Sequence, residues 1–199
     1  MKDVMEIGSH ADIHARILSK DTVVDYYDGS NGHWSDFYSY EEKPLIGFPI
    51  FPSCNSIASL RGFLKKEVKE FIKSIDNDFF SKQDWKKNLS VELEKKFNSL
   101  IDFESEENHR KRVTEEIVES KRQLELYTGI PVNHFSYPFG HFDSFSYDIV
   151  KQSYKSAFTT EIDIIRKSHK LHLLPRAKVH RDPFSFIGKL IKLSLRKQN

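Results

Sequence analysis

Residues 132–160 read VNHFSYPFGHFDSFSYDIVKQSYKSAFTT, and this stretch decides the fold class. VNHFSY is typical of a strand, PFG of a tight loop, SFSYDIVKQSY of a helix and SAFTT of a second strand. The later segment LHLLPRAKV predicts one more short strand. Strand, loop, helix and strand in this order indicate an α/β fold.

The segments before this stretch extend the alternation toward the N-terminus. Residues 105–129 predict a long amphipathic helix, which Ser105 can cap and Gly129 can end. At the start of the chain, residues 4–8 predict a short strand or turn, and His10–Leu18 predicts a helix. We therefore expect an α/β domain built from residues 1–18 and 105–199.

Residues 19–104 have a different character and are expected to form an inserted aromatic and helical subdomain. Apolar residues recur at helical spacing around 60–75 and again around 85–100, which predicts a helical hairpin and a mostly helical insertion. The first part is rich in aromatic residues, glycine and proline. Its aromatic side chains either offer faces for sugar rings or pack the insertion onto the domain, and the candidates are Trp34, Tyr38 and Tyr40.

Composition narrows the function classes. Thirty-one basic residues against 29 acidic ones argue against a dedicated nucleic-acid binder. The single cysteine excludes an internal disulfide. Neither a signal peptide nor a membrane span of about 18 apolar residues is visible, so we expect a protein that is cytoplasmic or peripheral to a membrane. The apolar and basic tail, residues 184–199, either docks on its own domain or lies on an anionic membrane.

Two histidines stand in the stretch EIGSHADIH, residues 6–14. On a helix, the i and i+4 spacing of His10 and His14 places both imidazoles on one face, where they can share a divalent metal. Imidazole nitrogen suits Zn, Co or Ni, and a catalytic site adds a third protein ligand and an open position for water. The alternative is a pair of polar residues at the start of a helix.

The Pro138-Phe139-Gly140 step follows a predicted strand and makes a rigid turn at its C-terminal end. In α/β barrels the catalytic residues lie at this end of the strands. A backbone N–H exposed by such a turn can stabilise an oxyanion. The alternative is an ordinary loop between a strand and a helix.

Three stretches together resemble one known family. EIGSHADIH resembles the second motif of the polysaccharide deacetylases of carbohydrate esterase family 4, which is EIGSH followed by Thr-x-x-His. Residues 115–160 resemble the run through the third motif of that family, and LLPRAKV resembles the strand that follows it. The resemblance covers residues 4–18 and about 113–180.

The resemblance implies a metal-dependent hydrolase that removes an N-acetyl or O-acetyl group from a sugar or polysaccharide, in bacterial surface polysaccharide synthesis. It implies a partial, distorted (β/α) barrel with Zn, Co or Ni held by His10 and His14. By the same resemblance, the backbone N–H of Phe139 contributes to the oxyanion hole. The substrate-binding residues that it suggests are Tyr137, Pro138, Gly140 and Arg176.

The sequence also departs from the family pattern. The first motif, a strand that ends in an Asp-Asp pair, has no counterpart, so the third metal ligand and the general base have no matched position. Ser136 stands where many members have an arginine. Three alternatives remain: the chain lacks its first strands, a partner chain or second copy completes the barrel, or the protein binds carbohydrate or another partner without catalysis.

Overall fold

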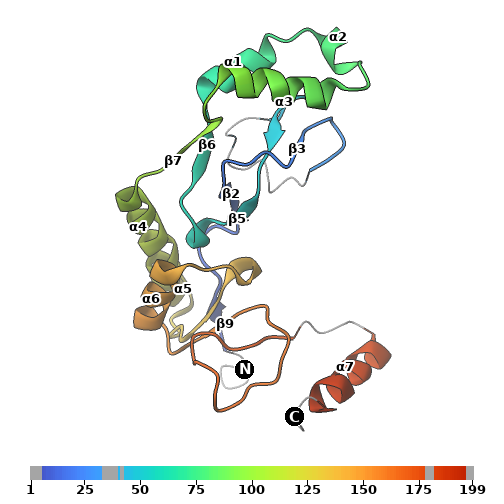
Figure 1. Ribbon diagram of the computed structural model, residues 1–199. Helices are drawn as coiled ribbons and strands as arrows, with labels where there is room; N and C mark the ends of the chain where they lie inside the picture. Colours follow the sequence, from blue (N-terminus) through green and yellow to red (C-terminus); the bar gives the residue numbers. More distant parts are fainter. Residues whose placement is uncertain (1–5, 33–39, 41–42, 178–181, 196–199) are drawn as a thin grey trace. The chain divides into compact units, whose positions relative to one another are not determined.

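The computed structural model describes residues 6–32, 40, 43–177 and 182–195. The chain divides into two compact units, labelled by element in Figure 1. The discontinuous unit consists of Met1–His14 and Arg112–Asn199, and the continuous unit is Ala15–Lys111. Both contain strands and helices, so the predicted α/β class is confirmed.

A three-stranded parallel sheet forms the centre of the discontinuous unit. Its order is β1-β8-β9, with bounds Gly8–Ser9, His134–Ser136 and Ser156–Phe158. In register, Gly8 lies opposite His134, and Ser136 lies opposite Phe158. The strands predicted in VNHFSY and SAFTT are therefore confirmed, and their carboxyl ends share one edge of the sheet.

Helices cover one face of this sheet. They are a π-helical turn (Glu115–Glu119), α5 (Ser120–Thr128) and α6 (Ser144–Ser153), and α4 (Glu106–Thr114) precedes the π-helical turn in the chain. The predicted ends of the long helix are confirmed, because the Asn108 N–H donates to Ser105 Oγ (3.2 Å) and Gly129 closes the helix with a φ of 65°. The buried apolar side chains of these strands and helices form the core of the unit. They are Val113, Ile117, Val132, Phe135, Val150 and Ala157.

The π-helical turn ties β1 to the helices. A π turn widens the helix and leaves carbonyls open to other donors. The Ile117 carbonyl accepts hydrogen bonds from Ser120 Oγ at 3.0 Å and from the Tyr154 hydroxyl at 2.9 Å. Ser120 Oγ also lies 3.0 Å from the buried Ser9 Oγ. The last residue of β1 is thereby fixed, and so is the start of the segment that carries the paired histidines.

Two sequence-based expectations about segments of this unit and its boundary are wrong. The segment His10–Leu18 is not a helix, because Ala11 has a left-handed φ of 63° and Arg16–Leu18 forms strand β2. In the predicted strand LHLLPRAKV, the described residues contribute only an isolated parallel bridge, between Leu174 and Phe158. Residues 178–179 lie outside the described part of the chain.

The continuous unit also contains short strands, which the expectation of a mostly helical insertion did not include. A four-stranded antiparallel sheet has the order β5-β2-β6-β7, and β3 pairs with β4 in a hairpin. The bounds are Ser53–Asn55 for β5, Gly62–Leu64 for β6, Ile101–Phe103 for β7, Asp25–Tyr26 for β3 and Pro49–Ile50 for β4. Strands of two or three residues are too short to show a period in the sequence.

The predicted helices of the continuous unit are present, but shorter than expected. They are α1 (Lys66–Lys73), the short α2 (Asn77–Phe80) and α3 (Trp85–Lys96), and a 3₁₀ turn occupies Ser56–Ala58. Val68, Ile72, Leu89 and Leu93 pack with Tyr40 in a common core. Tyr40 is 1% exposed and its hydroxyl donates to the Pro49 carbonyl, so it packs the unit rather than presenting a face for sugar. Trp34 and Tyr38 lie outside the described residues.

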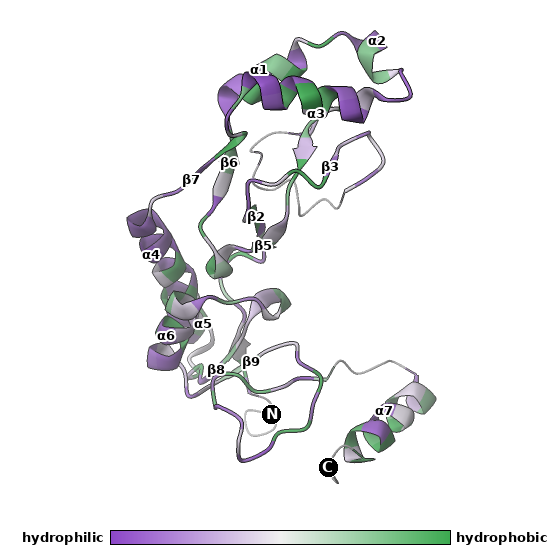
Figure 2. Ribbon diagram, viewed as in Figure 1, coloured by the Kyte–Doolittle hydropathy of each residue, from purple (hydrophilic) through white to green (hydrophobic). Residues whose placement is uncertain are grey.

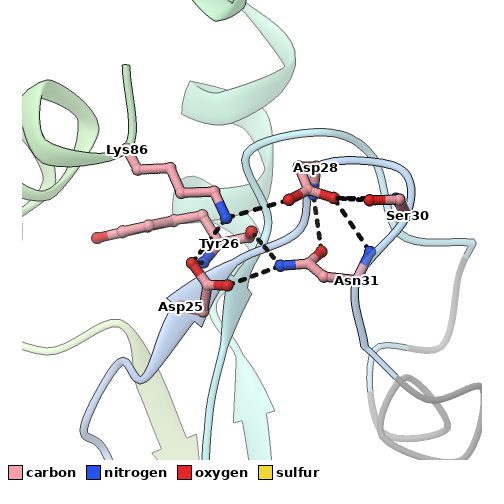
Figure 3. A network of polar contacts seen from close by, with 6 residues as sticks. All are labelled: Asp25, Tyr26, Asp28, Ser30, Asn31 and Lys86. Carbon is pink, nitrogen blue, oxygen red and sulfur yellow. Dashed lines mark hydrogen bonds and ion pairs between the residues drawn. The ribbon is translucent and has the colours of Figure 1, made fainter. Parts of the chain in front are cut away.

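A polar network joins the turn after β3 to α3 (Figure 3). Lys86 Nζ lies 2.9 Å from Asp25 Oδ1 and 3.1 Å from Asp28 Oδ2, and Asn31 bridges Asp25 to the Tyr26 carbonyl. Hydrogen bonds from Ser30, Asn31 and Lys86 hold the pKa of Asp28 well below its usual value. Burial acts to raise the pKa of Asp25, but its hydrogen bonds, chiefly from Lys86, bring it below the usual value.

Replacing Lys86 by methionine is expected to make stability less sensitive to acid. Carboxylates whose pKa is depressed in the folded state stabilise it above their unfolded pKa of about 3.9, and this contribution is lost as the pH falls through the folded pKa. Without Lys86 both depressions shrink. Thermal unfolding at pH 7 and pH 3 measures the difference, with Lys87→Met, at an exposed neighbouring lysine, as control. An unchanged pH dependence in the Lys86 variant would contradict this role.

Candidate functional site

The paired histidines and the Pro-Phe-Gly turn lie at the carboxyl edge of the parallel sheet. His10 follows β1 directly, and the turn Pro138–Gly140 begins two residues after β8. Because β1 and β8 are adjacent and parallel, both segments leave the sheet at the same edge. Open α/β sheets bind their ligands at this edge. The fold therefore brings together two stretches that are more than a hundred residues apart in sequence.

The imidazole of His10 is oriented by the neighbouring strand. Its Nδ1 lies 2.6 Å from the Ser136 carbonyl oxygen. A carbonyl only accepts, so Nδ1 carries the proton and Nε2 keeps its lone pair. Burial lowers the pKa of His10, and His14 and Arg176 lower it further, although the hydrogen bond to Ser136 acts in the opposite direction. A neutral ring with a backbone-anchored N–H is the form in which histidine binds metals.

His14 lies between His10 and the Pro-Phe-Gly turn. The ring centroids of His10 and His14 are 4.9 Å apart, and those of His14 and Phe139 are 4.3 Å apart. The expected proximity of the two histidines is present, although a left-handed turn at Ala11 produces it instead of a helix. The Phe139 ring forms a wall beside the histidine pair.

The turn itself has an unusual backbone. Phe139 has a φ of 55° and a ψ of 5°, a left-handed conformation that side chains other than glycine rarely adopt. The turn is held by hydrogen bonds from the Gly140 N–H to the Tyr137 carbonyl (2.9 Å) and from Thr160 Oγ1 to the Phe139 carbonyl (3.3 Å). Strained residues of this kind cluster at functional sites, and here the strain coincides with the residue that the motif singles out.

The structure brings some of the suggested substrate-binding residues to the site and withdraws others. Tyr137 is fully buried, and its ring lies 5.3 Å from that of Phe135 and 4.8 Å from that of Phe142. Burial raises the pKa of its hydroxyl. Pro138 is also buried, and Gly140 lies against Thr160. Tyr137 and Pro138 therefore shape the turn from within, and Gly140 packs it against Thr160.

Arg176 does reach the site. Its Nη1 donates to Ser136 Oγ at 2.5 Å, so Ser136 connects His10 and Arg176 through its carbonyl and its hydroxyl. Arg176 also lines an open cavity of about 600 Å³ on the sheet face opposite the helices. The other main lining residues are Glu6, His10, His134, Ser136 and Phe158.

His134, Glu6 and Ser156 form a polar group in this unit that sequence reasoning missed. His134 Nε2 lies 2.9 Å from Glu6 Oε1, and its Nδ1 lies 2.7 Å from Ser156 Oγ. The sequence did carry a signal for His134, because His134 and Ser136 are two residues apart in the predicted strand and so face the same side of the sheet. The cavity is therefore lined by the polar side chains of Glu6 and His134 in addition to that of His10.

The histidine pair offers two imidazole ligands for a divalent metal. Two observations make the pair suitable for a metal. The two ring centroids are 4.9 Å apart, and His10 Nδ1 is anchored on the Ser136 carbonyl, which leaves its Nε2 free to bind. Within residues 6–32, 40, 43–177 and 182–195, no cluster of three or more His, Cys, Asp or Glu side chains has metal-binding geometry. The described part of the chain thus shows two imidazoles that could hold a metal, and no third side chain beside them.

Comparisons by sequence find no relative, since no protein-family model and no curated protein matches the chain. Comparisons by structure do find similar proteins. A de-N-acetylase from Aggregatibacter actinomycetemcomitans has a TM-score of 0.50 and 14% identity, over 94% of this chain and 48% of that one. The BpsB deacetylase domain from Bordetella bronchiseptica has a TM-score of 0.49 and 11% identity, over 88% of this chain and 44% of that one.

A polysaccharide deacetylase from Bacillus cereus is more similar in sequence over a shorter stretch. Identity is 30% and the TM-score is 0.35, over 40% of this chain and 26% of that one. This chain thus spans less than half the length of each of these three structures. The likeness to the de-N-acetylase shows a common fold over the part of that protein that this chain spans, and the deacetylase resemblance that the motifs indicate is confirmed at the level of the fold.

Proposed function

We propose that the discontinuous unit carries the metal-binding and oxyanion-stabilising part of a metal-dependent deacetylase. The substrate would be a sugar or polysaccharide that bears an N-acetyl or O-acetyl group. The observation that carries the proposal is the contact of His10 and His14 with each other and of His14 with Phe139, at the carboxyl edge of the parallel sheet. The deacetylase fold supports the same reaction class.

Each residue has a defined task in this proposal. His10 and His14 would hold a divalent metal, most simply Zn, with Co or Ni as alternatives. When bound, such a metal supplies a water that is nucleophilic near neutral pH. The backbone N–H of Phe139 would donate to the oxygen of the attacked acetyl carbonyl. The Arg176 guanidinium, held by Ser136, would bind hydroxyl or carbonyl oxygens of the sugar.

We further propose that the three parallel strands belong to a (β/α) barrel of the deacetylase type. Their parallel order and the single helix-covered face support this, since parallel sheets are normally covered on both faces. The open cavity would then be part of the barrel interior. The segment 19–104 would be an insertion into that barrel, and the continuous unit Ala15–Lys111 contains all of it.

Acetate release tests the proposed reaction. The full chain, loaded with Zn or Co, is incubated with an N-acetylglucosamine oligomer, and free acetate is measured by NMR. We expect release by the wild-type chain and none by His10→Ala/His14→Ala. His169→Ala is the matched control, because His169 does not line the cavity. A metal-loaded chain that binds the oligomer but releases no acetate would contradict the enzyme and favour a non-catalytic carbohydrate-binding protein.

A further inference from the structure

Helix α7 (Pro183–Leu195) is defined by strong local signals. Asp182 caps it, because its carboxylate accepts a hydrogen bond from the Ser185 N–H at 2.7 Å and its carbonyl accepts one from the Phe186 N–H at 3.1 Å. Pro183 occupies the first helical position, where a missing N–H costs nothing. The segment therefore has its own reasons to be helical, apart from any tertiary contact.

The residues of α7 separate into two faces. At 100° per residue, the apolar side chains span more than half of the circumference, interrupted only by Ser194. These apolar residues are Phe184, Phe186, Ile187, Leu190, Ile191, Leu193 and Leu195. Ser185, Gly188, Lys189 and Lys192 occupy the remaining arc. Figure 2 shows apolar and polar residues side by side along this helix.

The apolar face of α7 is not covered by the described part of the chain. No residue of α7 is buried, and Phe184 is 87% exposed, Leu195 64% and Ile191 56%. Single exposed apolar residues are common on protein surfaces, but a continuous stripe of them marks a binding surface. Something outside these residues therefore covers the stripe in the working protein.

The charge of the segment indicates what that partner is. Residues 183–199 contain four of the chain's 31 basic residues and none of its 29 acidic ones. A second copy of the chain would bring the same positive charge to the contact. An anionic lipid surface has the opposite charge together with an apolar interior, and so it complements both faces of the helix.

We propose that α7 docks flat on an anionic lipid bilayer, with its apolar face in the acyl boundary and its lysines among the headgroups. The helix has 13 residues, so its length is about 20 Å, shorter than the hydrocarbon core of about 30 Å. Within the described residues, no helix has the length and apolar character of a membrane span. The in-plane orientation is therefore the one that fits. This proposal is independent of the proposed deacetylation.

Vesicle flotation of the full chain tests the proposal. We expect binding to vesicles of phosphatidylcholine and phosphatidylglycerol in equal parts, and much weaker binding to phosphatidylcholine alone. Ile187→Ser/Ile191→Ser should lower the affinity more than about tenfold. The matched control is Ile162→Ser/Ile165→Ser, because these isoleucines are 48% and 60% exposed but lie outside α7. The control should bind like the wild type.

The charged face is tested separately. Lys189→Gln/Lys192→Gln should lower the affinity for the mixed vesicles roughly thirtyfold and should leave the weak binding to phosphatidylcholine unchanged. Two results would overturn the proposal. They are absence of flotation with the mixed vesicles, and light scattering that shows self-association which only the Ile187/Ile191 variant abolishes.

Discussion

Replacement of Phe135 by alanine is expected to lower the free energy of unfolding of the discontinuous unit by about 3–5 kcal/mol. Phe135 is 1% exposed, and its ring lies 5.3 Å from that of Tyr137 and 5.1 Å from that of Tyr154. Truncation removes buried apolar area and leaves a cavity that the surrounding rings fill only in part. No other single substitution considered above should reduce stability as much.

Urea unfolding followed by far-UV circular dichroism measures this loss. Both tryptophans of the chain, Trp34 and Trp85, belong to the continuous unit, so their fluorescence follows that unit, and its midpoint should move less. Phe142→Ala is the matched control, because Phe142 packs on Tyr137 but is 37% exposed. Equal losses in the two variants would contradict the place of Phe135 in the core.

Gly140→Ala should destabilise the Pro-Phe-Gly turn by about 2–4 kcal/mol. Gly140 has a φ of 75°, and an added Cβ would lie 2.2 Å from Thr160 Oγ1 and 3.0 Å from the Thr160 backbone nitrogen. Either the turn or Thr160 must move. A shift of the turn also carries Phe139 away from the His14 ring, so we expect a loss of metal affinity together with the loss of stability.

Gly129 is a matched glycine for this experiment. It also has a positive φ, 65°, but nothing lies within 4 Å of its added Cβ. Gly129→Ala therefore introduces the strain of a positive φ without a steric collision of the kind expected at Thr160. Its expected loss of unfolding free energy is about 1 kcal/mol. The difference in unfolding free energy between the two variants measures the collision at Thr160. A difference near zero would contradict the close packing of the turn.

The parts of the fold that were predictable carry their signals locally. The strand at His134–Ser136 and the helix Ser144–Ser153 are marked by the turn between them and by Asp143, whose side chain caps the helix by accepting from the Ser146 N–H at 2.7 Å. Gly129 likewise marks the end of α5. Such elements need no knowledge of their partners, and so a single sequence suffices to place them.

The parts that were missed depend on distant partners. In the continuous unit, β6 exists because Phe63 pairs with Asp102, and β2 because Ile17 pairs with Cys54, and neither pairing leaves a local pattern. The proximity of His10 and His14 was predicted from a helix that does not form. Their rings meet because Ala11 turns the chain with a positive φ, which the sequence does not signal at an alanine.

Zinc binding by the full chain tests the central claim most directly. Equilibrium dialysis followed by elemental analysis is run on the wild type, on His10→Ala/His14→Ala and on the control His169→Ala. A Co²⁺ absorption spectrum reports imidazole ligation independently of activity. The account predicts one bound metal in the wild type and the control and none in the double variant, whereas equal metal content and identical Co²⁺ spectra in all three would contradict it.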